Sequence, residues 1–478
     1  MDEITKTARD IPLVVDLDRT LIKTNSLHEA FIQLVSQKPT QALRALLMLL
    51  HSRADFKVAI ADLMPLNVDT IPLNEVVLER IKQARKDGRK VYLATAAPRR
   101  FAEAIADLIA EFDGVFASRD GISLKGEAKA DRLVTAFGTC GFDYIGNDAA
   151  DLPSWRAART AFISGARPHM ARCVRSELPN AIVLDTRNFA IEPYLRALRP
   201  HQWLKNILVA LPLIAHHDFR VSSLLMVVAA MISFSLGASS IYLINDMLDL
   251  PHDRAHSHKR HRPLAAGTLP LSHAAVLFGI VAGLSVALAL MLPRAFVEIL
   301  VIYFALSMSY SVYLKRKVMI DVVTLASLYG IRVVAGGAAS GIQLSHWLIG
   351  FCFFIFLSLA LGKRTTEIMT LLKGSTDQIS GRGYRRIDLH TITALVASSG
   401  FVAVLVLALY INSSDVITLY HHPELLWGIC FILVYWLGRF CILAGRGEMN
   451  QDPIIFAATD RASLLAGIFV VAIFLAAL

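Results

Sequence analysis

Apolar stretches of about 20 residues recur in the second part of the chain and limit its fold more than any other feature. A helix of that length crosses the ~30 Å hydrocarbon core of a bilayer. Of the 478 residues, 55% are hydrophobic and 18% are charged, but the apolar excess begins only near residue 203. The pattern predicts a soluble N-terminal part followed by a helical membrane part.

Nine segments are candidate membrane spans. They lie near 203–219, 222–244, 272–292, 295–314, 319–340, 345–362, 391–411, 424–444 and 461–478. Lys and Arg gather after the even-numbered spans, which places those loops and the N-terminus in the cytoplasm and the C-terminus outside. The first span is interrupted by Pro212, and losing it would invert this orientation.

The charge and the N-terminus indicate the location of the protein. The net charge is +9, and many basic residues lie in loops between spans, so topology explains the excess and no nucleic-acid partner is expected. The first ten residues lack an apolar signal core, so we expect a multi-pass protein of the inner (cytoplasmic) membrane whose N-terminal domain stays in the cytoplasm. Five cysteines without CxxC spacing suggest neither a disulfide framework nor a zinc site.

Polar motifs follow apolar runs at intervals in the first 165 residues. In order, they are Asp16-Leu17-Asp18-Arg19-Thr20 after Ile11–Val15, Thr95 after Lys90–Ala94, Lys129 at the start of a helix through Phe137, and Gly146 to Asp151 after Phe142–Ile145. Buried strands that deliver polar loops at their C-terminal ends form α/β active sites. The four motifs in this order resemble the haloacid dehalogenase-like phosphatase superfamily.

That resemblance implies a role for each motif. Asp16 would form an aspartyl-phosphate, Asp18 would act as general acid and base, and Thr95 and Lys129 would hold the phosphoryl group. Lys129 is preferred to Lys125 because it stands at the start of a helix. The residues implied for Mg²⁺ are Asp16, Asp18, Asp148 and Asp151. Asn147 replaces the usual first Asp of the last motif, so a structural relic without turnover is the alternative.

We expect a Rossmann-like α/β domain over residues 1–165, a linker over 166–196 and an all-α transmembrane domain over 197–478. In such phosphatases an insert after the first motif forms a cap, here about 25–77. The alternative for this segment, which includes Ala42–His51, is a membrane-surface helix, because Leu46–Leu50 is apolar enough.

An acidic cluster closes the second span. Asp246, Asp249 and Asp253 are spaced i, i+3, i+7, so a helix would align them on one face beside Asn245. Divalent cations would relieve their repulsion, and Mg²⁺ commonly completes its shell with substrate phosphates. Lys259 and Arg262 follow and could hold free phosphate oxygens. The alternative is a solvated helix end of mixed charge.

This stretch resembles the NDxxDxxxD signature of UbiA-type membrane prenyltransferases, a nine-helix fold. The start of the region, Leu198–Asn206 with Lys205, is closer to the polyprenyl-phosphate (decaprenyl-phosphate) phosphoribosyltransferases. The further substrate-binding residues expected are Tyr310, Lys315, Arg332, Lys363, Arg364 and Glu367. An intramembrane Arg needs a polar partner, and Asp321 is the candidate for Arg332.

Three functions remain open. The first is Mg²⁺-dependent phosphoribosyl transfer from phosphoribosyl diphosphate to a polyprenyl phosphate, with the phosphatase domain removing the 5-phosphate. The second is transfer from a polyprenyl diphosphate to an aromatic acceptor, which uses the same acidic site. The third is a non-catalytic transporter or scaffold for lipid phosphates, although no inverted repeat is evident.

Overall fold

The computed structural model describes residues 11–48, 52–118, 123–256, 259–372, 382–413, 416, 419–449 and 453–478. Two compact units divide the chain. The first unit is Met1–Leu198 with Tyr242–Phe278, and the second unit is Arg199–Ile241 with Gly279–Leu478. The membrane helices α11 (Val221–Leu248) and α13 (Leu271–Ala289) each pass from one unit to the other.

The first unit contains a parallel sheet in the order β3-β2-β1-β4-β5-β6. Its strands are β1 Leu13–Val15, β2 Val91–Pro98, β3 Gly114–Ser118, β4 Asp143–Gly146, β5 Thr160–Ile163 and β6 Ile182–Val183. β1 pairs with β2 on one side and β4 on the other, so the strand order reverses there. Ligand sites of open α/β sheets lie at the carboxyl ends of strands beside such a reversal. The α/β domain expected from the sequence is confirmed.

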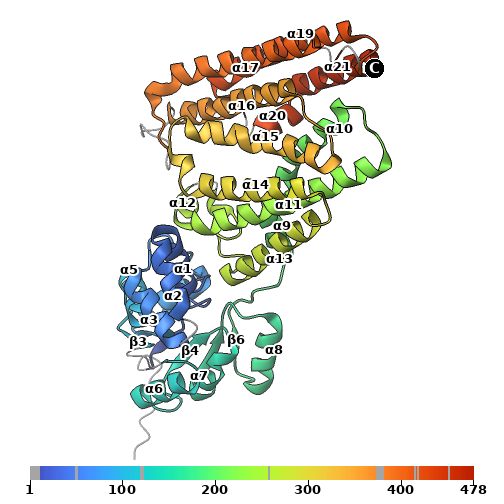
Figure 1. Ribbon diagram of the computed structural model, residues 1–478. Coiled ribbons are helices and arrows are strands. Elements are labelled where there is room, and N and C mark those ends of the chain that lie inside the picture. The colour runs from blue at the N-terminus through green and yellow to red at the C-terminus, as the bar shows by residue number, and fades with distance from the viewer. Residues whose placement is uncertain are drawn as a thin grey trace, which may run out of the picture. The chain divides into compact units, whose positions relative to one another are not determined.

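Alternating side chains of β1 serve two hydrophobic cores. Leu13 and Val15 pack on the face covered by α4 (Glu75–Lys86) and α5 (Arg99–Ile109). Val14 packs on the opposite face with Leu133, Trp155 and Val174. These residues come from α6 (Glu127–Phe137), α7 (Leu152–Ala157) and α8 (Pro168–Glu177), which are labelled in Figure 1. The period of two in a strand makes this division possible.

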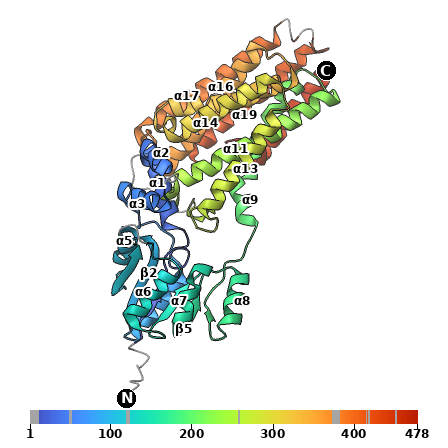
Figure 2. The same ribbon diagram turned by 60° about the horizontal axis from the view of Figure 1, so that its bottom comes forward.

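Three helices follow β1 and lie together in Figure 2. They are α1 (Ser26–Gln37), α2 (Pro39–Met48) and α3 (Arg53–Leu63), and they occupy the expected cap segment. Residues 49–51 of the segment 42–51 lie outside the described residues. On α2, Ala42 and Ala45 are buried while Leu43 and Leu47 are exposed, so the helix keeps an uncovered apolar stripe. Both interpretations of this segment, cap and membrane-surface helix, stay predictions.

The described residues contain seven helices long and apolar enough to cross a membrane. They are α11, α13, α14 (Arg294–Val312), α15 (Ile320–Ser340), α16 (His346–Leu372), α17 (Leu389–Ile411) and α19 (Trp427–Arg446). The shorter apolar helix α21 (Arg461–Ala477) covers the last expected span. The short elements between and before them are η1 Ala149–Asp151, α9 Glu192–Leu198, α12 Leu250–Ala255, η3 Lys259–His261, η4 Leu314–Arg316, η5 Arg386–Asp388, η6 Pro423–Leu426 and α20 Pro453–Thr459.

The expected count of nine spans is therefore not confirmed. The segment near 203–219 forms the 3₁₀-helix η2 (Pro200–Ala210) and the short α10 (Leu211–Ala215) instead of one α-helix. η2 packs closely on α15, because a Cβ on Gly336 would lie 1.9 Å from the carbonyl oxygen of Val209. Only a glycine permits that backbone approach.

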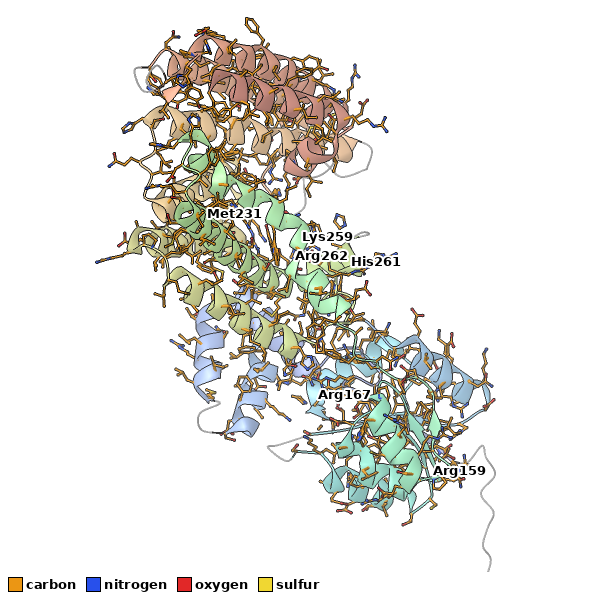
Figure 3. The ribbon with its side chains drawn as sticks, turned by 90° about the vertical axis from the view of Figure 1, so that its right-hand side faces the viewer. Arg159, Arg167, Met231, Lys259, His261 and Arg262 are labelled. Carbon is orange, nitrogen blue, oxygen red and sulfur yellow. The ribbon has the colours of Figure 1, made fainter. Side chains whose placement is uncertain are left out.

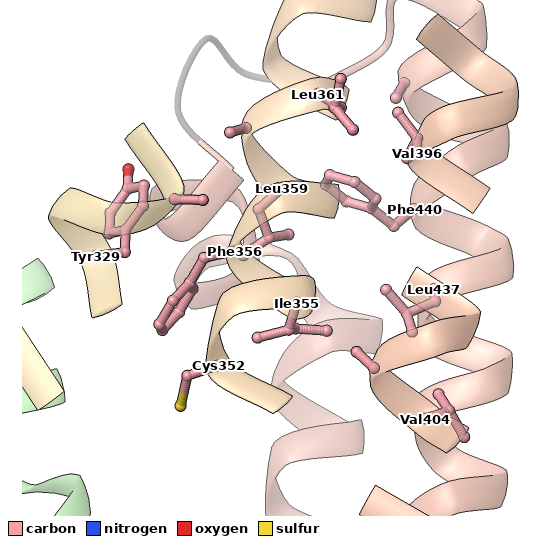
Figure 4. Packing of buried hydrophobic residues seen from close by; sticks show 14 of the residues in the cluster. Tyr329, Cys352, Ile355, Phe356, Leu359, Leu361, Val396, Val404, Leu437 and Phe440 are labelled. Atoms are coloured by element: carbon pink, nitrogen blue, oxygen red, sulfur yellow. The ribbon is translucent and has the colours of Figure 1, made fainter. Parts of the chain in front are cut away.

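The largest core of the second unit joins α15, α16, α17 and α19. Tyr329, Phe356, Val396 and Phe440 are among its buried members, and Figure 4 shows Phe440 near Leu361 and Val396. Elsewhere in the unit, Ser233 and Ser285 donate to each other's carbonyl oxygens at 2.8 and 2.7 Å. Small hydroxyl residues allow such close helix packing in membranes.

Candidate functional site

A buried ion-pair network lies at the carboxyl ends of β1 and β4 in the first unit. The Lys129 ammonium is 3.0 Å from Asp16 Oδ1 and 2.7 Å from Asp151 Oδ1. It also donates to Tyr144 Oη at 2.6 Å. Lys129 is buried, whereas Lys125 is exposed. The structure therefore brings together Asp16, Lys129 and Asp151, which the sequence placed in three separate motifs.

The surroundings shift the pKa values of Asp16 and Asp151 in opposite directions. Burial raises the pKa of Asp16 to about 7, and this exceeds the lowering by Lys129. Burial also disfavours the charge on Asp151, but the bonds from Lys129 and the Asn147 N–H hold the pKa of that carboxyl below its usual value. A buried carboxyl with a raised pKa beside a fixed cation is a common feature of active sites.

The other expected phosphatase residues make local hydrogen bonds, and Thr20 contacts the network directly. Asp18 Oδ1 accepts the Ser26 N–H at 2.7 Å, and Thr20 donates to Asp16 Oδ2 at 3.1 Å. Thr95 is buried and its hydroxyl accepts the Ala97 N–H at 3.0 Å. Asp148 is exposed and caps Ala149.

The carboxylates suit Mg²⁺ to different degrees. Asp151 already accepts bonds at both oxygens, from Lys129, Tyr144 and the Asn147 and Asp148 N–H groups. That arrangement makes Asp151 an anchor for Lys129. Asp16, Asp18 and Asp148 supply the hard oxygen donors that Mg²⁺ prefers.

The acidic cluster lies at the end of α11 and in α12. Arg262 Nη1 contacts Asp246 Oδ1 at 3.1 Å and Asp253 Oδ2 at 2.6 Å, so the two carboxylates converge on one cation. Both carboxylates are buried. Burial raises the pKa of Asp253, and Arg262 partly offsets this. Figure 3 shows Arg262 close to Lys259 and His261.

An unsatisfied oxygen marks the same place. Asn245 Oδ1 is buried and has no hydrogen-bond partner among the described residues, which is costly unless a ligand uses the atom. In the described part of the chain no group of three or more His, Cys, Asp or Glu side chains is arranged to hold a metal. Two converging carboxylates and an amide oxygen nevertheless fit Mg²⁺, which takes its remaining ligands from water and substrate phosphates.

A second buried ion pair links the cap segment to this cluster within the first unit. Arg254 donates to Glu29 of α1 at 3.1 and 2.7 Å, and the side chains are only 5% and 1% exposed. Arg254 follows Asp253 directly. The bidentate geometry fixes the orientation of α12 against α1.

The second unit has its own buried charged cluster. Arg364 Nε contacts Asp321 Oδ2 at 2.7 Å and its Nη1 donates to Glu367. Arg382 and Tyr310 share a hydrogen bond of 3.1 Å, and Arg382 lies 3.5 Å from Asp321. The two arginines and two carboxylates balance formally. Lys363 and Lys315 are partly exposed.

The expected pairing of Arg332 with Asp321 is wrong. Arg332 Nε donates to Asn206 Oδ1 at 2.9 Å and its guanidinium lies over the Tyr303 ring at 5.1 Å, while Lys205 lies over Tyr329 at 5.6 Å. Asp321 lies in the first turn of α15 and Arg332 comes 11 residues later, about 16 Å along a helix. Asp321 therefore meets Arg364 of α16 instead.

Sequence reasoning missed four members of these sites. Arg382 was one of many basic loop residues. Tyr384, which donates to Asp321 Oδ1, belongs to no motif that assigns it a site role, and neither do Tyr144 and Asn206. The best available signal was their position: Tyr144 precedes Gly146 by two residues, and Asn206 ends the segment Leu198–Asn206.

Two family models match the chain. The model of the UbiA prenyltransferase family covers residues 206–452, and that of the haloacid dehalogenase-like hydrolases covers residues 13–156. The chain belongs to the UbiA prenyltransferase family. With seven apolar helices of sufficient length among its described residues, it is an integral membrane protein that also carries a haloacid dehalogenase-like domain.

Relatives share different parts of this arrangement. Uncharacterized protein y4nM of Sinorhizobium fredii is 33% identical over 475 residues, which cover 98% of this chain and 92% of that protein. Decaprenyl-phosphate phosphoribosyltransferase of Corynebacterium glutamicum is 39% identical over 180 residues, 37% of this chain and about half (54%) of that protein. A solved UbiA homolog from Archaeoglobus fulgidus bound to DMAPP and Mg²⁺ covers 59% of this chain and 98% of its own, with 16% identity and a TM-score of 0.45.

Proposed function

We propose that this UbiA-family protein transfers a phosphoribosyl group from phosphoribosyl diphosphate to a polyprenyl phosphate on the cytoplasmic side of the membrane. The observation that carries the proposal is the 39% identity to a decaprenyl-phosphate phosphoribosyltransferase. The buried cluster of Asp246, Asp253 and Asn245 supports it as a place for a departing diphosphate.

The chemistry is a displacement at the ribose C1 atom. An oxygen of the lipid phosphate attacks C1 while the C1–O bond to the diphosphate breaks, which yields a polyprenyl-phosphoryl ribose 5-phosphate and free diphosphate. Asp246 and Asp253 would hold Mg²⁺, which neutralises diphosphate charge. Arg262, now bonded to both carboxylates, would turn toward phosphate oxygens, because a guanidinium binds phosphate by paired hydrogen bonds.

The fused domain would then remove the 5-phosphate of that product. Asp16 would attack the phosphorus, Asp18 would protonate the departing ribose O5, and water would hydrolyse the aspartyl-phosphate with Asp18 as base. Lys129 lies 3.0 Å from Asp16 Oδ1 and would stabilise charge on the phosphoryl oxygens. Tethering gives this second step a high effective concentration of its substrate. The domain limits 1–165, 166–196 and 197–478 are part of this proposal.

A comparison of the two possible donors tests the transferase. Purified full-length protein receives labelled phosphoribosyl diphosphate with decaprenyl phosphate, or labelled polyprenyl diphosphate with an aromatic acceptor. We expect a labelled transfer product only from the first mixture. Asp246→Asn should lower the rate of its formation at least about a hundredfold. The control is Glu298→Gln, an exposed carboxylate on α14. Product from the second mixture alone would establish the aromatic prenyltransferase, and lipid binding without any product would establish the non-catalytic alternative.

A product analysis tests the phosphatase. With Asp16→Asn, the lipid product should keep its 5-phosphate, while wild type and the exposed control Asp131→Asn release inorganic phosphate. Phosphate release by Asp16→Asn at the wild-type rate would contradict the proposed role of this domain.

A further inference from the structure

A cavity of about 600 Å³ opens beside the phosphatase motifs within the first unit. Three arginines line it, Arg19, Arg167 and Arg187, and Asn147 and Asp148 of the last phosphatase motif share its wall. Further lining residues are Phe189, Tyr194, Thr268 and His273. The cavity is therefore built from the phosphatase loops, the segment that follows β6, and the residues before and within the start of α13.

The backbone holds two of these arginines close together. Arg19 has a φ of 63°, in the left-handed region that is unfavourable for a residue with a Cβ. A Cβ on Gly165, whose own φ is 73°, would lie 2.4 Å from the Arg19 carbonyl oxygen. Strained backbone of this kind concentrates at functional sites. The close approach brings the loop after β1 against the loop after β5, which carries Arg167, labelled in Figure 3.

The positive charge in the cavity is poorly compensated. Arg187 Nη2 donates to the carbonyl oxygens of Gly267 and Thr268 at 2.8 and 2.9 Å, which leaves its charge unneutralised. No ion pair joins Arg19 or Arg167 to a described carboxylate, although burial raises the pKa of the neighbouring Asp18 and the charge of Arg19 lowers it in part. Burial, then Arg19 and Arg167, lower the pKa of Arg187, as repulsion between like charges requires. Among the described residues that line the cavity, Asp148 is the one acidic residue. Three cations with so little counter-charge favour an anion.

Apolar side chains continue the wall on one side. Phe189 is 77% exposed and packs against Tyr194 with ring centroids 5.5 Å apart, and Tyr194 is hydrogen-bonded to His273 at 2.6 Å. Ile191 and Leu195 of the same segment are also exposed. An arginine cluster bordered by exposed apolar residues suits a phosphate group attached to a hydrocarbon chain.

We infer that this cavity binds the second phosphate group of the phosphatase substrate, the phosphodiester that joins a prenyl chain to a sugar, while the terminal phosphate is hydrolysed at Asp16. The inference rests on the proposed function and specifies its substrate class: a lipid-linked phosphosugar with two phosphate groups. Arg19 stands three residues after Asp16 in one loop, so the cavity adjoins the loop of the nucleophile, as a substrate held at both of its phosphate groups requires.

Phosphate release by full-length protein in detergent with Mg²⁺ tests this assignment. Three probes are compared: ribose 5-phosphate, ribose 1,5-bisphosphate and farnesylphosphoryl ribose 5-phosphate. Arg167→Gln should raise KM about tenfold for the farnesyl probe and leave kcat and the ribose 5-phosphate reaction unchanged. Arg175→Gln, an exposed arginine of the adjacent α8 outside the cavity, should match wild type throughout. An equal rise with the bisphosphate would identify the phosphate as the recognised feature, and a smaller rise would assign part of the recognition to the prenyl chain.

The inference is overturned if Arg167→Gln equals wild type with all three probes, or impairs ribose 5-phosphate as strongly as the farnesyl probe. If wild type hydrolyses none of them, the phosphatase part of the proposed function fails, and equilibrium binding of the farnesyl probe decides about the cavity. Binding of the farnesyl probe about tenfold weaker to Arg167→Gln than to wild type would still support the role of the cavity. Equal binding to both would exclude that role.

Discussion

Asp143 shows how a single buried carboxylate stabilises the phosphatase-like domain. It is 1% exposed and pairs with Arg89 and with Arg159, the latter through two bonds of 2.9 and 2.7 Å. Arg89 also donates to the Ile11 carbonyl at 2.8 Å, next to β1. The network therefore ties β4 to the chain before β1, which leads to Asp16, and to the chain before β2, which carries Thr95.

Asp143→Asn should lower the free energy of unfolding of this domain by about 3 kcal/mol, because Arg89 would stay buried without a carboxylate. The measurement is urea-dependent hydrogen exchange of the β1 and β4 amides in the full-length protein. Glu177→Gln, which removes an exposed ion pair with Arg156, should change the value by less than about 1 kcal/mol. Equal effects of the two substitutions would show that burial does not determine how much an ion pair contributes to the free energy of unfolding.

Acid should weaken the same network. Burial raises the pKa of Asp143, but its bonds to Arg159 and Arg89 outweigh this and hold the pKa below the usual value. The folded state therefore gains stability from the charged form at any pH above about 4, and loses it as pH falls through the lower folded pKa. Hydrogen exchange of β4 at pH 6 and pH 3 should show less protection at pH 3, and the difference should shrink in Asp143→Asn. An equal difference in the variant would assign the acid effect to other carboxyls.

At the scale of helices and strands, the sequence predicted the elements whose formation depends on neighbouring residues. Apolar runs followed by polar motifs located β1, β2 and β4, because a buried parallel strand needs such a run. Residues 203–219 contain an apolar run that Pro212 interrupts, and they form η2 and α10. The close contact of η2 with Gly336 of α15 is far away in the sequence, and no local pattern encodes it. For the same reason the partner of Arg332 could not be predicted: Asn206 lies 126 residues away in the sequence.

Gly336→Ala should destabilise the membrane bundle, because a methyl group 1.9 Å from the Val209 oxygen must push η2 away from α15. Gly330→Ala on the same helix meets no atom within 4 Å and should be neutral or mildly stabilising. Thermal unfolding of the full-length protein in detergent distinguishes them, with a lower midpoint expected only for Gly336→Ala. Matching midpoints would mean that η2 moves without cost.

η2 and α10 together should still cross the membrane. Their 11 and 5 residues would extend about 30 Å at about 2.0 and 1.5 Å per residue. In a variant without the five native cysteines, Arg220→Cys should react with an impermeant maleimide outside intact cells, and Arg316→Cys only after lysis. The reverse pattern would show that η2 and α10 do not cross the membrane from a cytoplasmic N-terminal domain.

At the scale of the whole molecule, the two compact units are not two consecutive parts of the chain. Residues Tyr242–Phe278, which carry the acidic cluster, form one unit with the phosphatase-like domain. A hydrophobic cluster joins them, in which Ile32 of α1 and Ala197 pack with Leu243, Leu250 and Leu264. The buried Glu29–Arg254 pair adds a specific polar link. The acidic cluster therefore rests partly on side chains of the N-terminal domain.

Glu29→Gln should reduce lipid product formation about tenfold, although Glu29 belongs to the phosphatase-like domain, because Arg254 would remain buried without its carboxylate next to Asp253. The control Glu75→Gln changes an exposed carboxylate in the first turn of α4. The measurement is labelled lipid formed from phosphoribosyl diphosphate. Unchanged product formation in Glu29→Gln would show that the acidic cluster keeps its geometry without this pair.

The Glu29–Arg254 pair also restricts how such a fusion can change during evolution. A gene that exchanged its first half for another hydrolase would inherit an arginine with no acid to meet it, unless a matching substitution arose at the same time. Recombination near residue 198 should thus be tolerated only where the residues at positions 29 and 254 change together.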